Sequence, residues 1–336
     1  MQNKSKANKQ NSREGVNCRY HALQINLQRS QTATTELIIE AEKRKITFAI
    51  IQEPYVGRIG EIKQYKGVRV LQCARKTTDT VVKSVIIIFN DTINISQYPA
   101  LTTENFAVTK LRTGAWEIGV VSAYLEGDKP LGPYLETIKH AIQGLGTKSV
   151  IVAGDVNAWN TWWGSRETNE IGEEIAAFLD QHELHILNTG TEPTFDTVRG
   201  DRRYTSCVDI TTCSTTHLGR IDSCHLEKEM INSDHLAISF VLKLEKSKDS
   251  ITNICEDIFR KIPKKKTMTL PWWTEELANE KKELLQKKRR ISCAAPVRRE
   301  GVVKEYLQAK EEYEKEITAQ TISWKDFCTK QDGESM

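Results

Sequence analysis

The sequence lacks a long apolar segment. None of its stretches reaches the roughly 18 consecutive apolar residues that a membrane-spanning helix needs. The first stretch, MQNKSKANKQNSREG, is polar and has no hydrophobic core of a secretory signal. We therefore expect residues 1–19 to form a disordered basic arm. We also expect an intracellular protein, in the nucleus or the cytoplasm, with no membrane partner.

Paired cysteine motifs are also missing. The chain has eight cysteines, but no two of them stand at CxxC spacing. This scatter excludes the usual zinc-binding pattern and indicates reduced thiols, as in an intracellular protein.

A strong net charge of one sign is absent, since the whole chain carries only +3. The charge is uneven, however. From Arg260 onward there are 18 basic and 13 acidic residues, against 30 and 32 in the rest. A nucleic-acid partner therefore cannot be argued from the total charge and has to rest on local patches.

Residues 20–245 have the pattern of one α/β domain. Short apolar runs rich in β-branched residues alternate with turn residues. They predict strands over 21–27, 46–53, 68–73, 81–89, 115–125, 148–154, 206–213 and 235–242. Helices are predicted over 32–45, 131–143 and 170–182. Because the loops are short and long helical crossovers are few, we expect mixed, largely antiparallel sheets flanked by helices.

The character of the chain changes after residue 245. Residues 246–273 read as a linker, and two charged helices are predicted over 274–291 and 299–318, within a helical extension that covers 274–336. Apolar residues recur on each at helical spacing, from Leu277 to Ile291 and from Val303 to Ile317. The plain interpretation is a helical hairpin with a solvated charged face, and the alternative is a coiled-coil or docking segment.

Acidic residues stand at the ends of three predicted apolar strands, where the core itself has no use for a charge. The run IIQEPY places Glu53 after an apolar strand, and VIVAGDVNAW places Asp155 and Asn157 after another. The run INSDHLAISF places Asp234 and His235 just before a third. Together the three ends predict one site at the rim of a sheet.

These residue types suit phosphodiester hydrolysis. A carboxylate such as Glu53 can hold a hard divalent cation, and Asp155 can activate water. His235, oriented by Asp209, can stabilise the charge that develops on the phosphate.

Each of these residues also has an ordinary structural interpretation. Glu53 could end a strand in solvent, and His235 could be a structural histidine. Asn157 could cap the next segment, and Tyr124 could belong to the core. It is the combination and its order along the chain that favour a site.

The motifs LQINLQ, QEP, SAYL, GDVNAW, TSCVDIT and SDHLAI together resemble the endonuclease/exonuclease/phosphatase superfamily. More narrowly, residues 20–245 resemble the apurinic-type endonuclease domain of insect non-LTR retrotransposons, of the R-one and telomere-repeat clades. The resemblance implies a DNase I-like two-sheet α/β sandwich. It also makes LPWWTEEL and ISWKDFC resemble the connector that precedes a reverse transcriptase, although no reverse transcriptase follows before Met336.

The resemblance also implies roles for individual residues. Glu53 would be the principal ligand of Mg²⁺ or Mn²⁺, and Asn26 would help to hold the metal or its phosphate. Tyr124 would contact the scissile phosphate. Asp155, with Asn157 beside it, would align or deprotonate the attacking water.

Four more implied residues lie later in the chain. His235, oriented by Asp209, would stabilise the transition state, and Asp234 would support the histidine strand or the metal shell. Ser206 would lie next to the site. One position departs from the pattern of repair enzymes in the superfamily, which have an acid where this chain has Gln28. A neutral amide is a poorer Mg²⁺ ligand, so a metal-binding role for Gln28 is in doubt.

DNA contacts are expected from loops. Residues 195–206 hold Arg199, Arg202, Arg203 and Tyr204 just before Asp209, and arginine and tyrosine suit phosphate clamping and groove insertion. The alternative is a solvated hairpin tip. For the tryptophans of WNTWWGS (159–165) packing over the sheet edge is expected, with stacking on nucleic acid as the alternative.

The sequence thus predicts a Mg²⁺-dependent DNA-nicking endonuclease that leaves a 3′ hydroxyl. In an intact element its partners would be DNA, the downstream reverse transcriptase and the element RNA. Two other functions stay open. One is another phosphodiesterase of the superfamily, acting on RNA tails, lipid headgroups or inositol phosphates. The other is an inactive remnant that binds DNA or protein.

Overall fold

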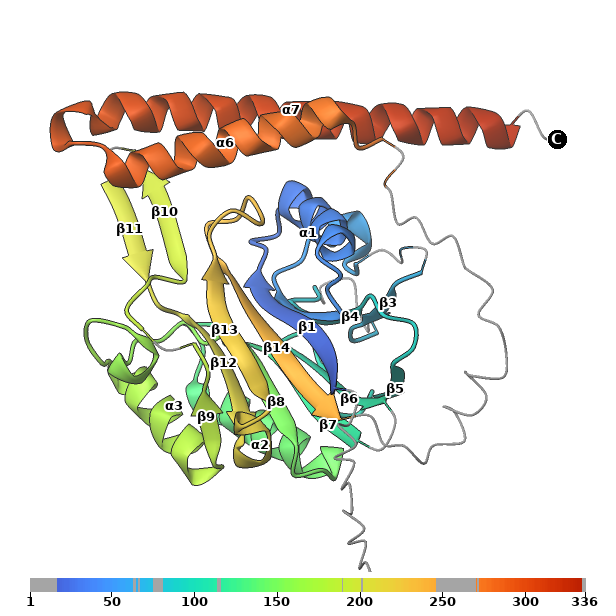
Figure 1. Cartoon of the computed structure of the whole chain (residues 1–336), viewed down its shortest axis with the longest axis vertical. Coiled ribbons are helices and arrows are strands. Elements are labelled where there is room, and N and C mark those ends of the chain that lie inside the picture. The colour runs from blue at the N-terminus through green and yellow to red at the C-terminus, as the bar shows by residue number, and fades with distance from the viewer. Residues whose placement is uncertain are drawn as a thin grey trace, which may run out of the picture.

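Two stacked β-sheets with helices on their outer faces form the body of the molecule, and a long helical hairpin lies across one end (Figure 1). A computed structural model describes residues 17–62, 65, 67–74, 81–113, 116–188, 190–200, 202–245, 270 and 272–333. Residues 1–16 of the predicted arm and nearly all of the predicted linker lie outside these ranges. The predicted two-sheet α/β sandwich is confirmed.

The first sheet has the strand order β13-β14-β1-β2-β4-β3. Its strands are β1 (Asn17–Asn26), β2 (Phe48–Gln52), β3 (Arg69–Leu71), β4 (Ser84–Ile88), β13 (Ile221–Glu227) and β14 (Ala237–Glu245). Only β1 and β2 pair in parallel, and the other pairs are antiparallel. Because β1 begins at Asn17, residues 17–19 belong to the sheet and not to the arm.

The second sheet has the order β5-β6-β7-β8-β12-β9, and again one pair, β7 with β8, is parallel. Its strands are β5 (Asn94–Gln97), β6 (Phe106–Thr113), β7 (Trp116–Tyr124), β8 (Val150–Asp155), β9 (Leu184–Ile186) and β12 (Asp209–Ser214). A separate two-stranded hairpin consists of β10 (Phe195–Arg199) and β11 (Arg202–Ser206).

The core has three layers because both faces of each sheet are covered. Phe48 and Ile50 of β2 face the second sheet in the central cluster, while Ala49 and Ile51 pack toward α1 (Gln31–Lys43). The outer face of the second sheet packs against α2 (Leu131–Leu145) and α3 (Glu170–Gln181). Strands covered on both sides read as continuous apolar runs, which explains the run Ile46–Ile51. A short helix, α4 (Thr215–Leu218), follows β12.

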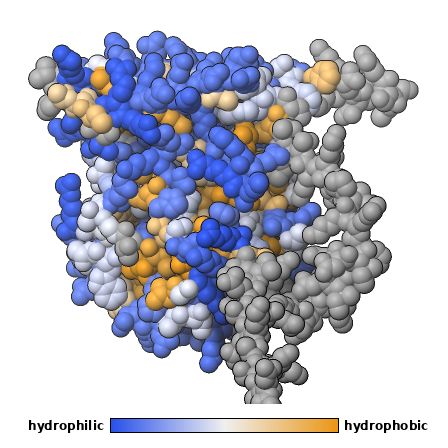
Figure 2. All heavy atoms as spheres, in the orientation of Figure 1, coloured by the Kyte–Doolittle hydropathy of each residue, from blue (hydrophilic) through white to orange (hydrophobic). Residues whose placement is uncertain are grey.

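The C-terminal region forms the predicted helical hairpin, with α6 (Glu275–Cys293) and α7 (Pro296–Gly333). Thr274 caps α6 by accepting a hydrogen bond from the Leu277 backbone N–H, and Pro296 begins α7, a position that suits proline. The apolar residues at helical spacing pack between the helices, together with Val198 of β10. The outward surface of the two helices is mostly hydrophilic (Figure 2). Among the described residues, no helix is both long and apolar enough to cross a membrane.

Gly154 of β8 offers a test of the sheet geometry. A Cβ atom at this position would lie 1.7 Å from the carbonyl oxygen of Ala123 on the parallel neighbour β7. We expect Gly154→Ala to lower the free energy of unfolding by at least the roughly 1–3 kcal/mol typical of overpacking, measured by urea denaturation. Gly132→Ala in α2 is the control, because a Cβ there meets nothing within 4 Å. Equal midpoints for the two variants would contradict the close approach of β7 and β8.

Candidate active site at the rim of the sandwich

The strand ends that the sequence singled out meet at one rim. Asn26 ends β1 and Glu53 follows the parallel strand β2. Asp155 ends β8, and its partner across the antiparallel pair is Asp209, the first residue of β12. Parallel neighbours end at the same edge of a sheet, so each sheet delivers its polar side chains to the same place.

His235 and Asp209 form a buried pair. Nδ1 of the imidazole lies 2.8 Å from Oδ2 of Asp209, and both side chains are almost fully buried. Burial alone lowers the pKa of His235, but the charge and hydrogen bond of Asp209 outweigh it and raise the pKa to about 9. The imidazole is therefore cationic at neutral pH in the ion-free protein, and Nε2 is the ring nitrogen left for a ligand.

A chain of side chains holds Asp209 from the other side. Gln24 donates to Oδ1 of Asp209 over 3.1 Å and to Oε1 of Gln52 over 2.7 Å. Gln52 in turn donates to the Ser122 hydroxyl over 2.9 Å. All of these residues are buried, so this chain fixes the orientation of the carboxylate that orients the histidine.

Asp155 is the second buried carboxylate. It accepts hydrogen bonds from Nδ2 of Asn26 at 2.9 Å and from the backbone N–H of Asn157 at 3.0 Å. Burial raises the pKa of Asp155 to about 7, and the neighbouring charge of Asp209 adds to the rise while His235 opposes it. Two adjacent buried carboxylates thus share one cationic partner.

Glu53 lies nearer to solvent. Its carboxylate contacts Nδ2 of Asn26 at 3.3 Å and the Arg29 guanidinium at 3.1 Å, and it is hydrogen-bonded to Tyr124. Burial and the negative charges of Glu53 and Asp155 raise the pKa of Tyr124, so the phenol stays protonated. The phenol is therefore a hydrogen-bond donor at this rim.

The backbone at the rim is strained. Gln28, Arg29, Glu53 and Asn157 all have a positive φ, between +46° and +56°. Non-glycine residues rarely adopt this conformation, and such residues cluster at functional sites. Here the strain turns the chain sharply after β1, β2 and β8, which leaves the side chains of Glu53 and Asn157 at the rim.

The donor set fits a hard divalent cation. Oxygens of Glu53 and Asp155 converge on the amide nitrogen of Asn26, so a polarised positive group already lies where the carboxylates meet. Asp155, Asp209 and His235 also lie close enough to share one ion. We favour a cation beside Glu53, because Asp209 and Nδ1 of His235 are committed to each other, and carboxylate oxygens suit Mg²⁺.

Gln28 and Asp234 form a second hydrogen-bonded pair at the rim. The Gln28 amide accepts from the Asp234 backbone N–H at 2.9 Å and donates to its carboxylate at 3.3 Å. Thr197 also donates to this carboxylate, at 2.7 Å. Burial would raise the pKa of Asp234, but Lys310, Thr197, Lys288 and Gln28 outweigh it and lower the pKa. Of the two expected roles of Asp234, support of the histidine strand fits these contacts.

The predicted DNA-binding residues lie on the β10–β11 hairpin and not in the buried cluster. Arg199 and Arg202 are cross-strand partners near its tip, and the side chain of Tyr204 is exposed. Arg203 is held by Asp196 through two hydrogen bonds of 2.7 Å. The base of the hairpin reaches the site, because the Phe195 ring packs edge-on against His235, with ring centroids 4.8 Å apart.

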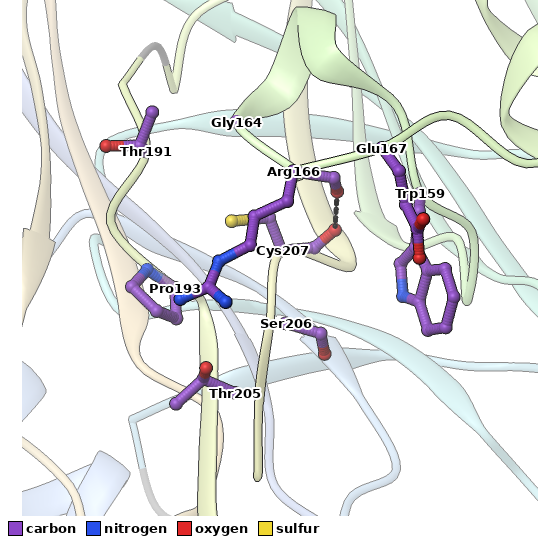
Figure 3. Close-up of a pocket in the computed structure, with 10 residues that line it drawn as sticks. Trp159, Gly164, Arg166, Glu167, Thr191, Pro193, Thr205, Ser206 and Cys207 are labelled. Carbon is purple, nitrogen blue, oxygen red and sulfur yellow. Dashed lines mark hydrogen bonds between the residues drawn. The ribbon is translucent and has the colours of Figure 1, made fainter.

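A hollow of about 320 Å³ opens beside the site, between the loop 159–167 and β11 (Figure 3). Ser206 lines it, near the hydrogen bond from the Ser165 hydroxyl to the Cys207 carbonyl oxygen, at 3.1 Å. The three nearby tryptophans differ in burial. Trp163 is buried in the core, as expected, but Trp159 and Trp162 are exposed. Packing therefore accounts for only one of the three.

Sequence reasoning missed several supporting residues. Gln24 and Gln52 were passed over, although both are polar residues within apolar strands, a signal that could have been used. Arg29 and Thr194 were missed too. The hydroxyl of Thr194 accepts the backbone N–H groups of Val208 and Asp209, a long-range contact that no local pattern indicates.

Two solved structures share the fold. The AP endonuclease LMAP from Leishmania major matches 67% of this chain and 88% of its own, with a TM-score of 0.54 and 11% identity. The catalytic domain of Xenopus laevis APE2 matches 68% of this chain and 94% of its own, with a TM-score of 0.54 and 12% identity. At these identities the likeness concerns the fold alone, and it confirms the expected DNase I-like sandwich.

Closer relatives give the family. The endonuclease domain of TRAS1, a telomere-specific non-LTR retrotransposon, is 45% identical, with a TM-score of 0.63 over 68% of this chain and 100% of that domain. A family model described as endonuclease-reverse transcriptase matches residues 118–239. This chain belongs to the endonuclease family of the non-LTR retrotransposons.

A curated relative shows the larger context. The putative 115 kDa protein in the type-1 retrotransposable element R1DM of Drosophila melanogaster is 26% identical in an alignment over 234 residues that covers 65% of this chain. The chain spans about a fifth of the length of that protein, 21%.

The contact between Asp209 and His235 predicts how the imidazole titrates in the metal-free protein. We expect the imidazole of His235 to titrate at a pH of about 9. In Asp209→Asn the midpoint should fall toward the ordinary value of about 6.5 or below, because the opposing charge is lost while burial remains. NMR of the histidine side chains in EDTA measures both. Asp196→Asn removes a carboxylate held by Arg203 and is the control; an equal drop in this variant would refute a specific role for Asp209.

Proposed function

We propose that this chain is a divalent-metal-dependent endonuclease that nicks duplex DNA by hydrolysing one phosphodiester bond. The observation that carries the proposal is the convergence at one rim of the Asp209–His235 pair with Asp155, Glu53 and Asn26. Family membership supports it, because the TRAS1 relative is itself described as an endonuclease domain.

Each residue then has a chemical task. Glu53, helped by Asn26, would hold Mg²⁺ or Mn²⁺, which when bound neutralises negative charge on the phosphate. Asp155, braced by the Asn157 backbone, aligns the water and accepts its proton. The water oxygen attacks phosphorus, the bond from phosphorus to the 3′ oxygen breaks, and the departing oxygen takes up a proton from solvent. The products are a 3′ hydroxyl and a 5′ phosphate.

The remaining groups stabilise the charge that develops in this step. The His235 imidazolium, oriented by Asp209, donates through Nε2 to a phosphate oxygen. Tyr124, whose phenol is kept protonated, donates to another oxygen. Asp234 takes no part in the chemistry and holds the turn that carries His235.

The partners follow from the relatives. The matching family model is described as endonuclease-reverse transcriptase, and the R1DM protein extends far beyond the matched region, so a reverse transcriptase and an element RNA are proposed partners of an intact element. The 3′ hydroxyl left by the nick is a primer end for such a polymerase. DNA is the proposed substrate of the site described here.

Glu53 provides the test of metal dependence. We expect Glu53→Gln to slow the relaxation of supercoiled plasmid by about 100-fold or more. Mutating a residue that only hydrogen-bonds to a metal ligand already lowers metal affinity or activity by about 10–100-fold. Nicking is followed across a Mg²⁺ titration and in EDTA. Glu174→Gln on the exposed side of α3 is the matched control. If wild type binds plasmid but never nicks it, the inactive binding remnant is the better account.

The β10–β11 hairpin provides the test of target choice. Metal and phosphate are the same in every DNA sequence, so the selector must be a segment that reaches bases or senses DNA shape. We expect Arg202→Ala with Tyr204→Ala to redistribute the nick positions on a long duplex while the total rate changes less than about threefold. Arg203 is left intact because it holds Asp196.

The control for this experiment is Lys139→Ala, an exposed lysine on α2. Uniformly slower cleavage with an unchanged nick map would show that the hairpin only clamps phosphates. The selector would then be sought in the loops 55–66 or 159–169.

A further inference from the structure

The turn that delivers His235 has no regular structure of its own. Residues 228–236 connect β13 to β14 without a helix, and their strand-like contact is an isolated antiparallel bridge between His235 and Phe195. In Figure 1 this turn reaches up toward α6. Buried backbone groups in such a segment need partners elsewhere. On the site side, the Ser233 hydroxyl donates to the Asn26 carbonyl oxygen at 2.8 Å and accepts from the His235 backbone N–H at 3.2 Å.

On its other side the turn is held by lysines of the α6–α7 hairpin. Lys281 donates to the Met230 carbonyl oxygen at 2.8 Å, and Lys288 donates to the Ser233 carbonyl oxygen at 2.7 Å. Lys310 of α7 lies 4.0 Å from Oδ1 of Asp234. Three lysines from two helices thus contact the segment that immediately precedes the histidine.

A buried acid of α1 adds a further link. Glu36 accepts the Asn232 backbone N–H at 2.6 Å through one oxygen and the Tyr313 hydroxyl at 2.6 Å through the other. Lys281 lies 3.7 Å from the same carboxylate and 3.3 Å from Glu40. A buried carboxylate that loses its partners is costly, so the hairpin is not a freely solvated appendage of this domain.

The hairpin is nevertheless an addition to the endonuclease fold. The whole endonuclease domain of TRAS1 is matched by only 68% of this chain, and the family-model match ends at residue 239, before α6 begins at Glu275. Its apolar residues pack mainly between its own two helices, with Val198 joining them from β10. Its direct polar contacts with the domain are concentrated on the turn before His235 and on α1.

We propose that the α6–α7 hairpin is a positioning element for the histidine of the site, with Lys288 and Lys310 as the positioning residues. This inference rests on the proposed nicking function. Lys288 holds the carbonyl oxygen of Ser233, and Lys310 lies next to the carboxylate of Asp234. Together they fix the turn that sets where His235 meets Asp209 and the phosphate. Nicking in this protein therefore depends on a segment outside the endonuclease fold.

The experiment uses the full chain with Lys288→Met, which keeps the length of the side chain and removes its charge and donors. We expect kcat for plasmid nicking to fall about tenfold, with KM nearly unchanged. A displacement of a catalytic group by about 1 Å can lower the rate by up to about 100-fold, so this loss is in the expected range. Amide hydrogen exchange across 230–236 should become faster. Lys288→Arg should restore most of the rate, because it restores a cationic donor.

The matched control is Lys304→Met, which alters an exposed lysine on the same hairpin. If Lys288→Met does not fold, Lys310→Met is measured in its place, because that lysine holds a side chain and no backbone carbonyl. A rise in KM with kcat unchanged would overturn the proposal and assign the lysines to DNA binding. Unchanged exchange and unchanged kcat would overturn it as well.

Failure of the proposed function can be told apart from failure of this inference. If wild type does not nick DNA under any condition, the exchange rates of 230–236 and the His235 resonance still report the position of the turn. Faster exchange and a shifted resonance in Lys288→Met, but not in Lys304→Met, would support positioning without nicking. Identical values in both variants would refute it.

Discussion

The buried hydrogen bond between Asp209 and His235 is the interaction on which the site depends. A carboxylate with no solvent exposure is costly unless it is paired and hydrogen-bonded, and Asp209 belongs to the second sheet. Its partners, Gln24 and His235, come from the first sheet or its connections. The polar chain from Gln24 to Gln52 and Ser122 then crosses back to the second sheet. The same contacts that orient the histidine therefore also fix one sheet against the other.

A consequence of this arrangement is an excess of negative charge at the rim. The charge of Asp209 is balanced by His235. Asp155 is buried beside this pair, and its hydrogen-bond donors are the neutral Asn26 amide and the backbone N–H of Asn157. Glu53 shares Asn26 with Asp155 and has Arg29 on its solvent side. The raised pKa of Asp155 expresses the same imbalance, because burial and Asp209 both disfavour its charge. A cation entering near Asn26 would relieve it, which is why this donor set favours metal-dependent chemistry over a metal-free acid and base pair.

Much of the fold and of the candidate site could be predicted from the sequence, for physical reasons. Strands buried on both faces, such as β2 and β8, are continuous apolar runs, so the acids that end them stand out. Six strands in the described part of the chain were not predicted. β5, β10 and β11 are polar and β9 has only three residues, while in β6 and β13 polar residues interrupt the apolar ones. The helical period predicted α6 and α7, but their docking depends on Lys281 meeting Glu40, 241 residues away. Contacts of that range leave no trace in local periodicity.

Gln28 and Lys310 contact the turn before His235 from two sides. An acid here would place a second carboxylate against Asp234 and could only accept hydrogen bonds. The glutamine amide instead accepts from the Asp234 backbone and donates to its carboxylate, and this needs both ends of an amide. Lys310 approaches the other oxygen of Asp234 from α7. In this chain the hydrogen bonds of Gln28 therefore suit it to holding the histidine turn, and Glu53 remains the proposed metal ligand.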